Sequence, residues 1–243
     1  ALAALAAGKH VVVEKPLAIS SQEAGQIVEA AGRAEGCLMP AMCIRFWPQW
    51  AWLKQAVVQR RYGGVRAATF RRVAQMPPGW FQDGEKSGGA VMDLHIHDTD
   101  FVSYLFGQPR AVFSRGYSQT TSRIDHLVTH YVYDDVPLVV AEGSWAMADG
   151  FGFNMAYTVN FERATADFDF SRSERPLTVS QDGKQEVVDC GQGDGWVEEL
   201  RYLVDCLAGG RRPTAITAED ALASILIAEA EVRSIASGAL EPL

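Results

Sequence analysis

The stretch KHVVVEKP, residues 9–16, sets a run of three valines directly before Glu14, Lys15 and Pro16. A β-branched run of this length is typical of a short strand that is buried in a parallel sheet. Residues 1–7 before it are rich in Ala and Leu and stop at a glycine, which predicts the second half of a helix. A helix followed by such a strand is one repeat of an α/β domain.

The residues after this stretch repeat the same alternation. Residues 17–36 carry serines at capping positions and end at a glycine, so they predict a helix, and residues 37–44 predict a second strand. Helix, strand, helix, strand is the order of a doubly wound α/β domain. We therefore expect residues 1–42 to be the final portion of such a domain.

From residue 43 the pattern changes. Residues 46–64 predict a helix that ends at two glycines. In residues 65–75 apolar and polar residues alternate, which predicts a strand with one solvent-exposed face. Short alternating segments, which predict a mostly antiparallel sheet, follow at residues 111–117, 127–133, 138–145, 154–161, 165–170 and 177–180. Two capped amphipathic helices are predicted at residues 195–210 and 217–238. The expected fold class is α/β (α+β), with an open, mostly antiparallel sheet covered by helices in residues 43–243.

The composition limits the partners and the compartment. The 243 residues are 48% hydrophobic and 21% charged, which is ordinary for a globular protein. A formal charge of −8 with dispersed basic residues argues against nucleic acid or a membrane as a partner, because both attract clustered Lys and Arg. Four cysteines without a CxxC pair indicate reduced thiols, so we expect a cytoplasmic protein. Because the sequence opens without Met or a signal peptide, we interpret it as the middle of a longer chain, cut inside a helix.

The stretch SGGAVMDLHIHDTDFVSYLFGQP, residues 87–109, gathers two histidines and three aspartates. An HxH pair indicates a metal site only on a strand, where residues i and i+2 face the same way. The apolar residues of this stretch recur at helical spacing, so a helix separates His95 from His97 and stacks Asp93 over His97. We therefore expect no metal site, and we interpret His95 as a packed or surface residue.

Asp93 and His97 at i, i+4 suit a carboxylate that orients an imidazole, as a general acid or base requires. The alternative is a structural pair on a helix, which is the commoner meaning of such a spacing. Two glycines before the helix favour function slightly, because backbone or ligand can approach closely there. Asp98 and Asp100 suit the helix macrodipole, and we expect no more of them than that.

Glu14, Lys15 and Pro16 follow directly on a predicted parallel strand, at the edge where open α/β sheets bind ligands. Pro16 restricts Lys15 to extended backbone, so the ammonium can stay at the strand end. Taken alone, a Lys-Pro after a strand is usually an ordinary turn. The Lys-Pro pair indicates a functional site only in combination with Asp93 and His97.

Four segments in this order resemble the Gfo/Idh/MocA family of NAD(P)-dependent oxidoreductases: AGKHVVVEKPLA, RFWP, the stretch of residues 87–109, and the closing TAEDALASILIAEAEVRSIASG. The resemblance implies a dinucleotide-binding Rossmann domain, of which residues 1–42 are the C-terminal remnant. It implies a substrate and oligomerisation domain in residues 43–243, whose open sheet often forms the interface of a homo-oligomer. The implied cofactor is NAD or NADP.

By this resemblance Lys15, Asp93 and His97 are the catalytic residues and line the cleft between the domains. Lys15 contacts substrate and cofactor, with Glu14 and Pro16 beside it on the cofactor side, while His97 exchanges the hydroxyl proton and Asp93 holds or assists it. The implied reaction is hydride transfer between a secondary alcohol of a sugar, polyol or related compound and NAD(P). The weaker candidates for substrate binding, each with a packing or surface role as the alternative, are Arg45, Trp80 and Asn154.

The family's G-x-G-x-x-G phosphate loop does not occur after a strand in this sequence. We therefore expect a fragment that binds a dinucleotide poorly and is inactive alone. Two alternatives to a dehydrogenase stay open. One is a hydrolase or lyase on the same scaffold that oxidises its substrate transiently, and the other is a non-catalytic binding or oligomerisation module.

Overall fold

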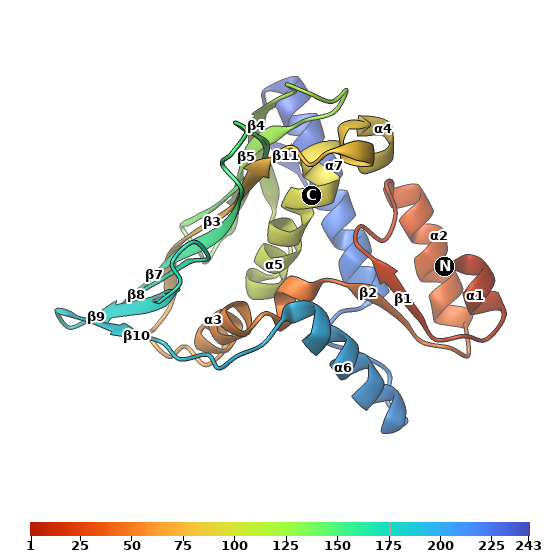
Figure 1. The fold of residues 1–243 in the computed structure, drawn as a ribbon, viewed down its shortest axis with the longest axis horizontal. Helices are drawn as coiled ribbons and strands as arrows, with labels where there is room; N and C mark the ends of the chain where they lie inside the picture. The colour runs from red at the N-terminus through yellow and green to blue at the C-terminus, as the bar shows by residue number, and fades with distance from the viewer. Residues whose placement is uncertain (175) are drawn as a thin grey trace.

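The computed structural model describes residues 1–174 and 176–243. Its N-terminal part consists of α1 (Leu2–Ala6), β1 (Val11–Glu14), α2 (Ser21–Arg33) and β2 (Leu38–Ala41). β1 and β2 pair in parallel, and Ser20 caps α2 by accepting the N–H of Glu23. The predicted alternation of helix and strand is confirmed, and this part lies at the right of Figure 1.

The rest of the chain is built on a nine-stranded sheet in the order β10-β9-β8-β7-β3-β6-β5-β4-β11. Its strands are β3 (Val65–Gln75), β4 (Ala111–Tyr117), β5 (His126–Val132), β6 (Leu138–Met147), β7 (Phe153–Phe161), β8 (Thr165–Asp169), β9 (Leu177–Gln181), β10 (Lys184–Val187) and β11 (Glu241–Pro242). β3 and β6 run parallel, and the other neighbouring pairs of described strands are antiparallel. The predicted mostly antiparallel sheet is confirmed.

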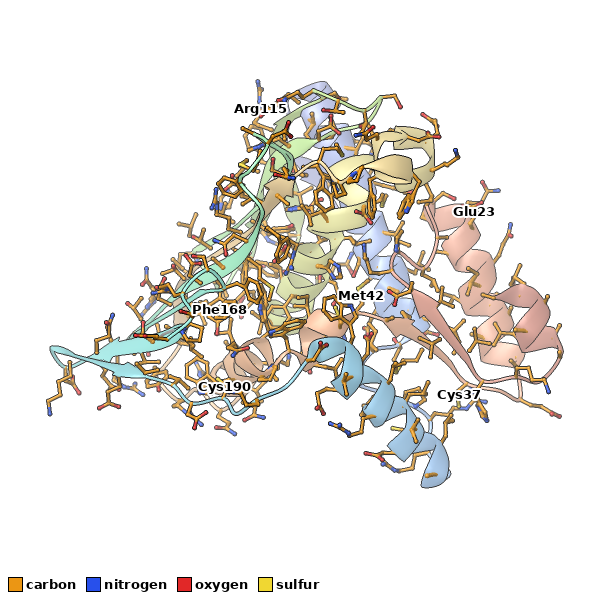
Figure 2. All side chains as sticks on the ribbon, viewed as in Figure 1. Glu23, Cys37, Met42, Arg115, Phe168 and Cys190 are labelled. Carbon is orange, nitrogen blue, oxygen red and sulfur yellow. The ribbon has the colours of Figure 1, made fainter. Side chains whose placement is uncertain are left out.

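Three helices cover one face of this sheet: α3 (Pro48–Val58), α5 (Ile96–Phe106) and α7 (Ala218–Ser237) (Figure 1). The core between them centres on Trp50, whose ring lies 4.8 Å from Phe101 and 5.3 Å from Tyr157. Figure 2 shows the side chains that fill this space, with Phe168 of β8 among them. Among the helices of the described residues, none combines the length and the apolar character needed to cross a bilayer.

The helix α6 (Gly195–Ala208) approaches the short 3-10 turn η1 (Cys43–Phe46) very closely. Asp194 caps α6 by accepting the N–H of Trp196 at 2.8 Å. A Cβ atom at Gly195 would lie 2.5 Å from the carbonyl oxygen of Cys43, so only glycine allows this approach. The close packing brings the first turn of α6 beside the strand ends of the N-terminal part.

The stretch predicted as one helix is divided in the structure. After η2 (Gly79–Gln82) and α4 (Gly84–Ser87), the chain forms a π-helical turn, η3 (Val91–His95), which leads directly into α5. Gly88 ends α4 with a φ of 73°, a conformation that glycine adopts without strain. Because a π-turn closes i to i+5 bonds, it alters which side chains of this stretch lie above one another.

Candidate active site

Lys15 belongs to the first of the two motifs, residues 14–16, and contacts the second motif, the stretch of residues 87–109. Its ammonium lies 2.9 Å from Oδ1 of Asp93 and also donates to the backbone carbonyl oxygen of Asp93, although 78 residues separate the two in sequence. Lys15 follows β1 and is linked to Pro16 by a cis peptide bond. Both side chains are largely buried, with 16% of the lysine and 8% of the aspartate exposed. The carboxyl end of β1 is thereby fixed to the π-turn η3.

His97 stands one turn further along and lines a pocket of about 310 Å³. The pocket is mostly apolar, and the basic side chains on its wall are those of His97 and Arg72. The aromatic rings on its wall belong to Trp47, Phe153, Phe170 and Trp196. A pocket of this size is at the lower end of the range for small-molecule sites.

The surroundings of His97 keep its imidazole neutral. Burial, followed by the positive charges of Lys15 and Arg72, lowers the pKa of His97 well below 6.5. Among the described residues its Nδ1 atom has no hydrogen-bond partner. A neutral imidazole beside a pocket can accept a proton from a bound hydroxyl group at neutral pH.

Among the described residues, no hydrogen bond joins the predicted pair of Asp93 and His97. The carboxylate of Asp93 pairs with Lys15, and the imidazole of His97 lines the pocket. Asp93 lies in η3, where the ammonium of Lys15 reaches it from the end of β1. In this structure Asp93 therefore holds the ammonium of Lys15.

Arg72 on β3 is a pocket residue that the sequence analysis missed. It donates from Nε and Nη2 to Asp98 at 2.7 and 3.3 Å, and it is 2% exposed while Asp98 is fully buried. The sequence signal was available in TFRRV, where alternation places Arg72 on the same face as the core residue Phe70. Asp98, expected only to complement the helix macrodipole, is the buried partner of this arginine.

Glu199 of α6 is a second residue that the sequence analysis missed. Its side chain is 2% exposed, and its Oε2 has no partner among the described residues. Burial, followed by the charges of Glu14 and Asp194, raises the pKa of Glu199 to about 8. Burial and the charge of Glu199 also raise the pKa of the Cys43 thiol to about 12, so that thiol is unreactive. Within an amphipathic helix an acidic residue is usually a surface group, so the helical pattern does not reveal that Glu199 is buried.

Arg45, which the sequence analysis predicts to bind substrate, is not among the residues that line this pocket. It donates to both carboxylate oxygens of Asp100, at 2.7 and 2.8 Å, and to the carbonyl oxygen of Ala215 at 2.8 Å. The guanidinium also lies 4.3 Å from the centre of the Tyr104 ring. These contacts use its hydrogen-bond donors inside the protein, which favours the alternative of a packing role.

Trp80 and Asn154 also lie away from the pocket wall. Trp80 is 52% exposed and stacks on Phe81 at a ring distance of 4.1 Å. Asn154 pairs with Val73 across β7 and β3, whereas its neighbour Met155 pairs with Arg72 on the pocket side. Because side chains alternate along a strand, Asn154 faces the opposite side of the sheet. The structure therefore does not bring Trp80 or Asn154 together with His97 at this pocket.

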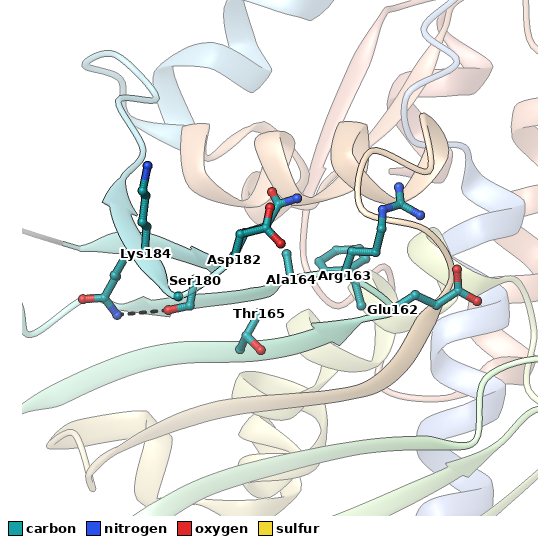
Figure 3. Close-up of a pocket in the computed structure, with 11 residues that line it drawn as sticks. Glu162, Arg163, Ala164, Thr165, Ser180, Asp182 and Lys184 are labelled. Atoms are coloured by element: carbon teal, nitrogen blue, oxygen red, sulfur yellow. Dashed lines mark hydrogen bonds between the residues drawn. The ribbon is translucent and has the colours of Figure 1, made fainter.

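A second, more open depression of about 540 Å³ lies near the tip of the sheet, among residues 161–165 and 180–185 (Figure 3). Its lining includes Glu162, Arg163, Asp182 and Lys184. It is formed by the turns that join β7 to β8 and β9 to β10, at the end of the molecule far from β1 (Figure 1). It contains no residue of the two motifs, so the pocket of His97 is the candidate active site.

Among the described residues, no group of three or more His, Cys, Asp and Glu side chains is arranged to hold a metal ion.

Comparison with known proteins identifies both parts of the chain. Residues 1–42 match the profile of the oxidoreductase family with an NAD-binding Rossmann fold, and residues 50–167 match the GFO/IDH/MocA C-terminal domain. The 1,5-anhydro-D-fructose reductase of Ensifer adhaerens is 32% identical over 45% of this chain, and the trans-1,2-dihydrobenzene-1,2-diol dehydrogenase of Mus musculus is 34% identical over 44%. The chain spans 34% and 32% of the lengths of these two relatives.

A solved structure shares the whole fold. The levoglucosan dehydrogenase in complex with NADH and levoglucosan superposes on 99% of this chain and 75% of its own, with a TM-score of 0.88. The two sequences are 19% identical, so this likeness concerns the fold.

Proposed function

The chain belongs to the GFO/IDH/MocA family of oxidoreductases, and we propose that it oxidises a secondary alcohol of a sugar, polyol or related cyclic compound by hydride transfer to NAD or NADP. The observation that supports this most is that Lys15, held by Asp93, acts electrostatically on a neutral His97 that lines a pocket. Two of the relatives, a reductase of a sugar derivative and a dehydrogenase of a cyclic diol, point to the same class of substrate.

His97 is the proton acceptor in this proposal. When an alcohol is oxidised by loss of a hydride, its hydroxyl proton must also leave. The imidazole lines the pocket and is neutral, so it can take that proton at neutral pH. In the direction of ketone reduction, the same imidazole returns the proton to the oxygen.

Lys15 stabilises the negative charge that develops on the substrate oxygen as the proton leaves. An ammonium fixed in advance in a site of low polarity acts strongly on such a charge. Asp93 holds the ammonium by two contacts, through its carboxylate and its backbone carbonyl. Asp93 is therefore a positioning residue that acts through Lys15.

The cofactor side of the site includes Glu14, Lys15 and Pro16. They lie directly at the carboxyl end of β1, which is where open parallel sheets bind their ligands. Glu14 is exposed and can accept hydrogen bonds from hydroxyl groups, and Lys15 can donate to them. These residues fit one side of a dinucleotide site, and NAD or NADP, when bound, supplies the hydride acceptor.

The test is turnover by the complete gene product. Five compounds are mixed in turn with NAD⁺ or NADP⁺: D-glucose, D-xylose, myo-inositol, 1,5-anhydro-D-glucitol and trans-1,2-cyclohexanediol. Formation of NADH or NADPH is followed by absorbance, and the reverse reaction is tested with 1,5-anhydro-D-fructose. We expect net cofactor reduction with at least one compound.

Two outcomes contradict the proposal. No change in cofactor with any compound means that the chain does not act as a dehydrogenase of this class. Product formation without net cofactor reduction instead indicates a hydrolase or lyase that oxidises its substrate transiently.

We also propose that the chain forms a homo-oligomer in the cytoplasm. Phe113, Val128 and Leu138 are exposed on the outer face of the sheet. The pairing of β4 with β5 and of β5 with β6 places these three side chains on the same side. The four cysteines are free thiols, as in a reducing compartment. Light scattering after size-exclusion chromatography tests the assembly, and a monomeric mass contradicts it.

A further inference from the structure

We propose that Arg72 binds a second oxygen of the substrate, so that the site selects cyclic secondary alcohols with an additional hydroxyl or ether oxygen on the same small ring. This inference rests on the proposed function and adds a specificity-determining residue to it. Its basis is the way in which Arg72 is held beside the pocket and the incomplete use of its hydrogen-bond donors.

Arg72 is fixed in place by Asp98. Its Nε and Nη2 atoms donate to the two carboxylate oxygens at 2.7 and 3.3 Å, and both residues are almost fully buried. The guanidinium also lies 5.4 Å from the centre of the Trp50 ring, in the core of the sheet domain. A guanidinium that is held by a two-point contact keeps its remaining nitrogen in a defined position.

The remaining nitrogen, Nη1, carries two N–H donors with little to bind. Among the described residues its hydrogen-bond partner is the thioether sulfur of Met155, at 3.5 Å. A thioether is a weak acceptor, whereas a buried charged donor without a good acceptor carries a desolvation cost. Arg72 lines the pocket, so a ligand oxygen there can supply the acceptor that the protein does not.

One small molecule in this pocket can contact both of its basic side chains, His97 and Arg72. Arg72 and His97 are on the wall of the same space of about 310 Å³. If the reacting hydroxyl binds His97, then a second oxygen of the same small molecule can bind Arg72. The aromatic rings of Trp47, Phe153, Phe170 and Trp196 on this wall suit the apolar faces of a saturated ring. A vicinal diol on a six-membered ring has these features.

The test compares the binding of two probes that differ by one oxygen, trans-1,2-cyclohexanediol and cyclohexanol. Because Trp47 and Trp196 are on the pocket wall, tryptophan fluorescence of the complete gene product can follow equilibrium binding without turnover. We expect the wild-type protein to bind the diol about 10-fold or more tightly, as one hydrogen bond to a charged group provides. Equal affinities, or no binding of either probe, overturn the proposal.

Variants separate substrate binding from a purely structural role. Arg72→Lys keeps a cation next to Asp98 but removes the Nη1 donor, so we expect it to lose the preference for the diol while cyclohexanol binds as before. The matched control is Arg71→Lys, because Arg71 is the neighbouring residue on the same strand and pairs with Glu142 on the other side of the sheet. The control should keep the wild-type preference. An equal weakening of both probes in Arg72→Lys would mean that Arg72 only supports the fold.

Met155→Gln provides a second variant in case Arg72→Lys does not fold. It leaves the pair of Arg72 and Asp98 intact and offers an amide oxygen to Nη1, so it should also reduce the preference for the diol. A preference that persists in Met155→Gln overturns the proposal. Failure of the proposed function is recognised separately, because it appears as the absence of cofactor reduction and not as a change in the ratio of the two affinities.

Discussion

His97 owes its protonation state to the residues around it. Lys15 and Arg72 both lower its pKa, and each cation is held by its own carboxylate, Asp93 or Asp98. Because both carboxylates are paired with cations, the imidazolium form gains no carboxylate partner from them. The neutral form is favoured, which is the form that a proton acceptor requires.

Glu199 makes the stability of the protein depend on pH. Its pKa of about 8 in the folded state is above its ordinary value of 4.5, so between these values the folded state keeps a proton that the unfolded state has lost. Stability due to this group is therefore lost as the pH rises from 4.5 to 8. Glu199→Gln removes the effect, and we expect the variant to exceed wild type at pH 9 by roughly 3 kcal/mol.

The measurement is the free energy of unfolding in urea at pH 5 and at pH 9. The control is Glu198→Gln, because Glu198 is the adjacent acid and pairs with Arg201 at the surface. The control should follow wild type at both pH values. If wild type and Glu199→Gln differ by the same amount at both pH values, Glu199 is not protonated in the folded state.

At the scale of elements, Arg45 ties three helical segments together. It lies in η1, pairs with Asp100 of α5 at 2.7 Å, and approaches Asp220 of α7 at 3.3 Å. Removing one partner of a buried ion pair leaves the other charge without compensation. Arg45→Met should therefore reduce the free energy of unfolding by about 3–5 kcal/mol.

The control for Arg45 is an exposed pair. Arg33→Met breaks a contact with Glu29 in which both side chains are about two-thirds exposed, so we expect a loss below about 1 kcal/mol. Urea unfolding measures both variants. Similar losses in the two variants would show that Arg45 is not a structural residue and would return it to the list of substrate-binding candidates.

The π-turn η3 depends on a glycine in the facing strand. A Cβ atom at Gly143 of β6 would lie 2.6 Å from two side-chain atoms of His95, which is fully buried and hydrogen-bonded to Tyr131. Gly143→Ala must displace the turn, and with it the side chain of His97. We expect a loss of roughly 1–3 kcal/mol of stability, as in an overpacked core, and a fall in kcat.

The matched control is Gly25→Ala in α2. A Cβ atom there meets no other atom within 4 Å, so the change should stabilise the helix by about 0.5–1 kcal/mol. Thermal unfolding and turnover measure both variants. Unchanged stability and turnover in Gly143→Ala would contradict the role given to this contact.

The sequence predicted the elements better than it predicted the contacts. The patterns of residues 1–42 and of the alternating strands depend on burial of one face, which composition and period report directly. The partner of Asp93 could not be predicted, because Lys15 lies 78 residues away in sequence and meets it only in the folded chain. Arg72 and Asp98 are separated by 26 residues in sequence and meet only when β3 packs on α5.

Arg45 is another residue whose contacts could not be predicted from the sequence. The sequence placed it at the start of the second domain, near the expected site, and a charged residue there resembles a ligand contact. Its partners Asp100 and Ala215 come from distant segments, so only the fold reveals that its donors are already used. The edge strands β10 and β11 were missed because they are short.

In the whole molecule, the N-terminal part shares a hydrophobic core with the rest of the chain, and polar contacts add to this attachment. Lys15 after β1 binds Asp93 of η3, and Ser21 of α2 donates from its backbone N–H and its hydroxyl to Glu229 of α7, each at 2.8 Å. These contacts fix the end of β1 relative to the pocket of His97. The geometry of the site therefore depends on both parts of the chain.

His97 is proposed to accept the hydroxyl proton during oxidation, so the pH dependence of kcat/KM in the complete gene product should differ from that of His97→Asn. For wild type we predict a rate that falls on the acid side with an apparent pKa below 6.5, because the folded protein lowers the pKa of this imidazole. His97→Asn should lose this limb and be slower by about 10²–10⁴-fold, the usual contribution of a general base. A variant that keeps both the wild-type rate and the wild-type acid limb would contradict the claim.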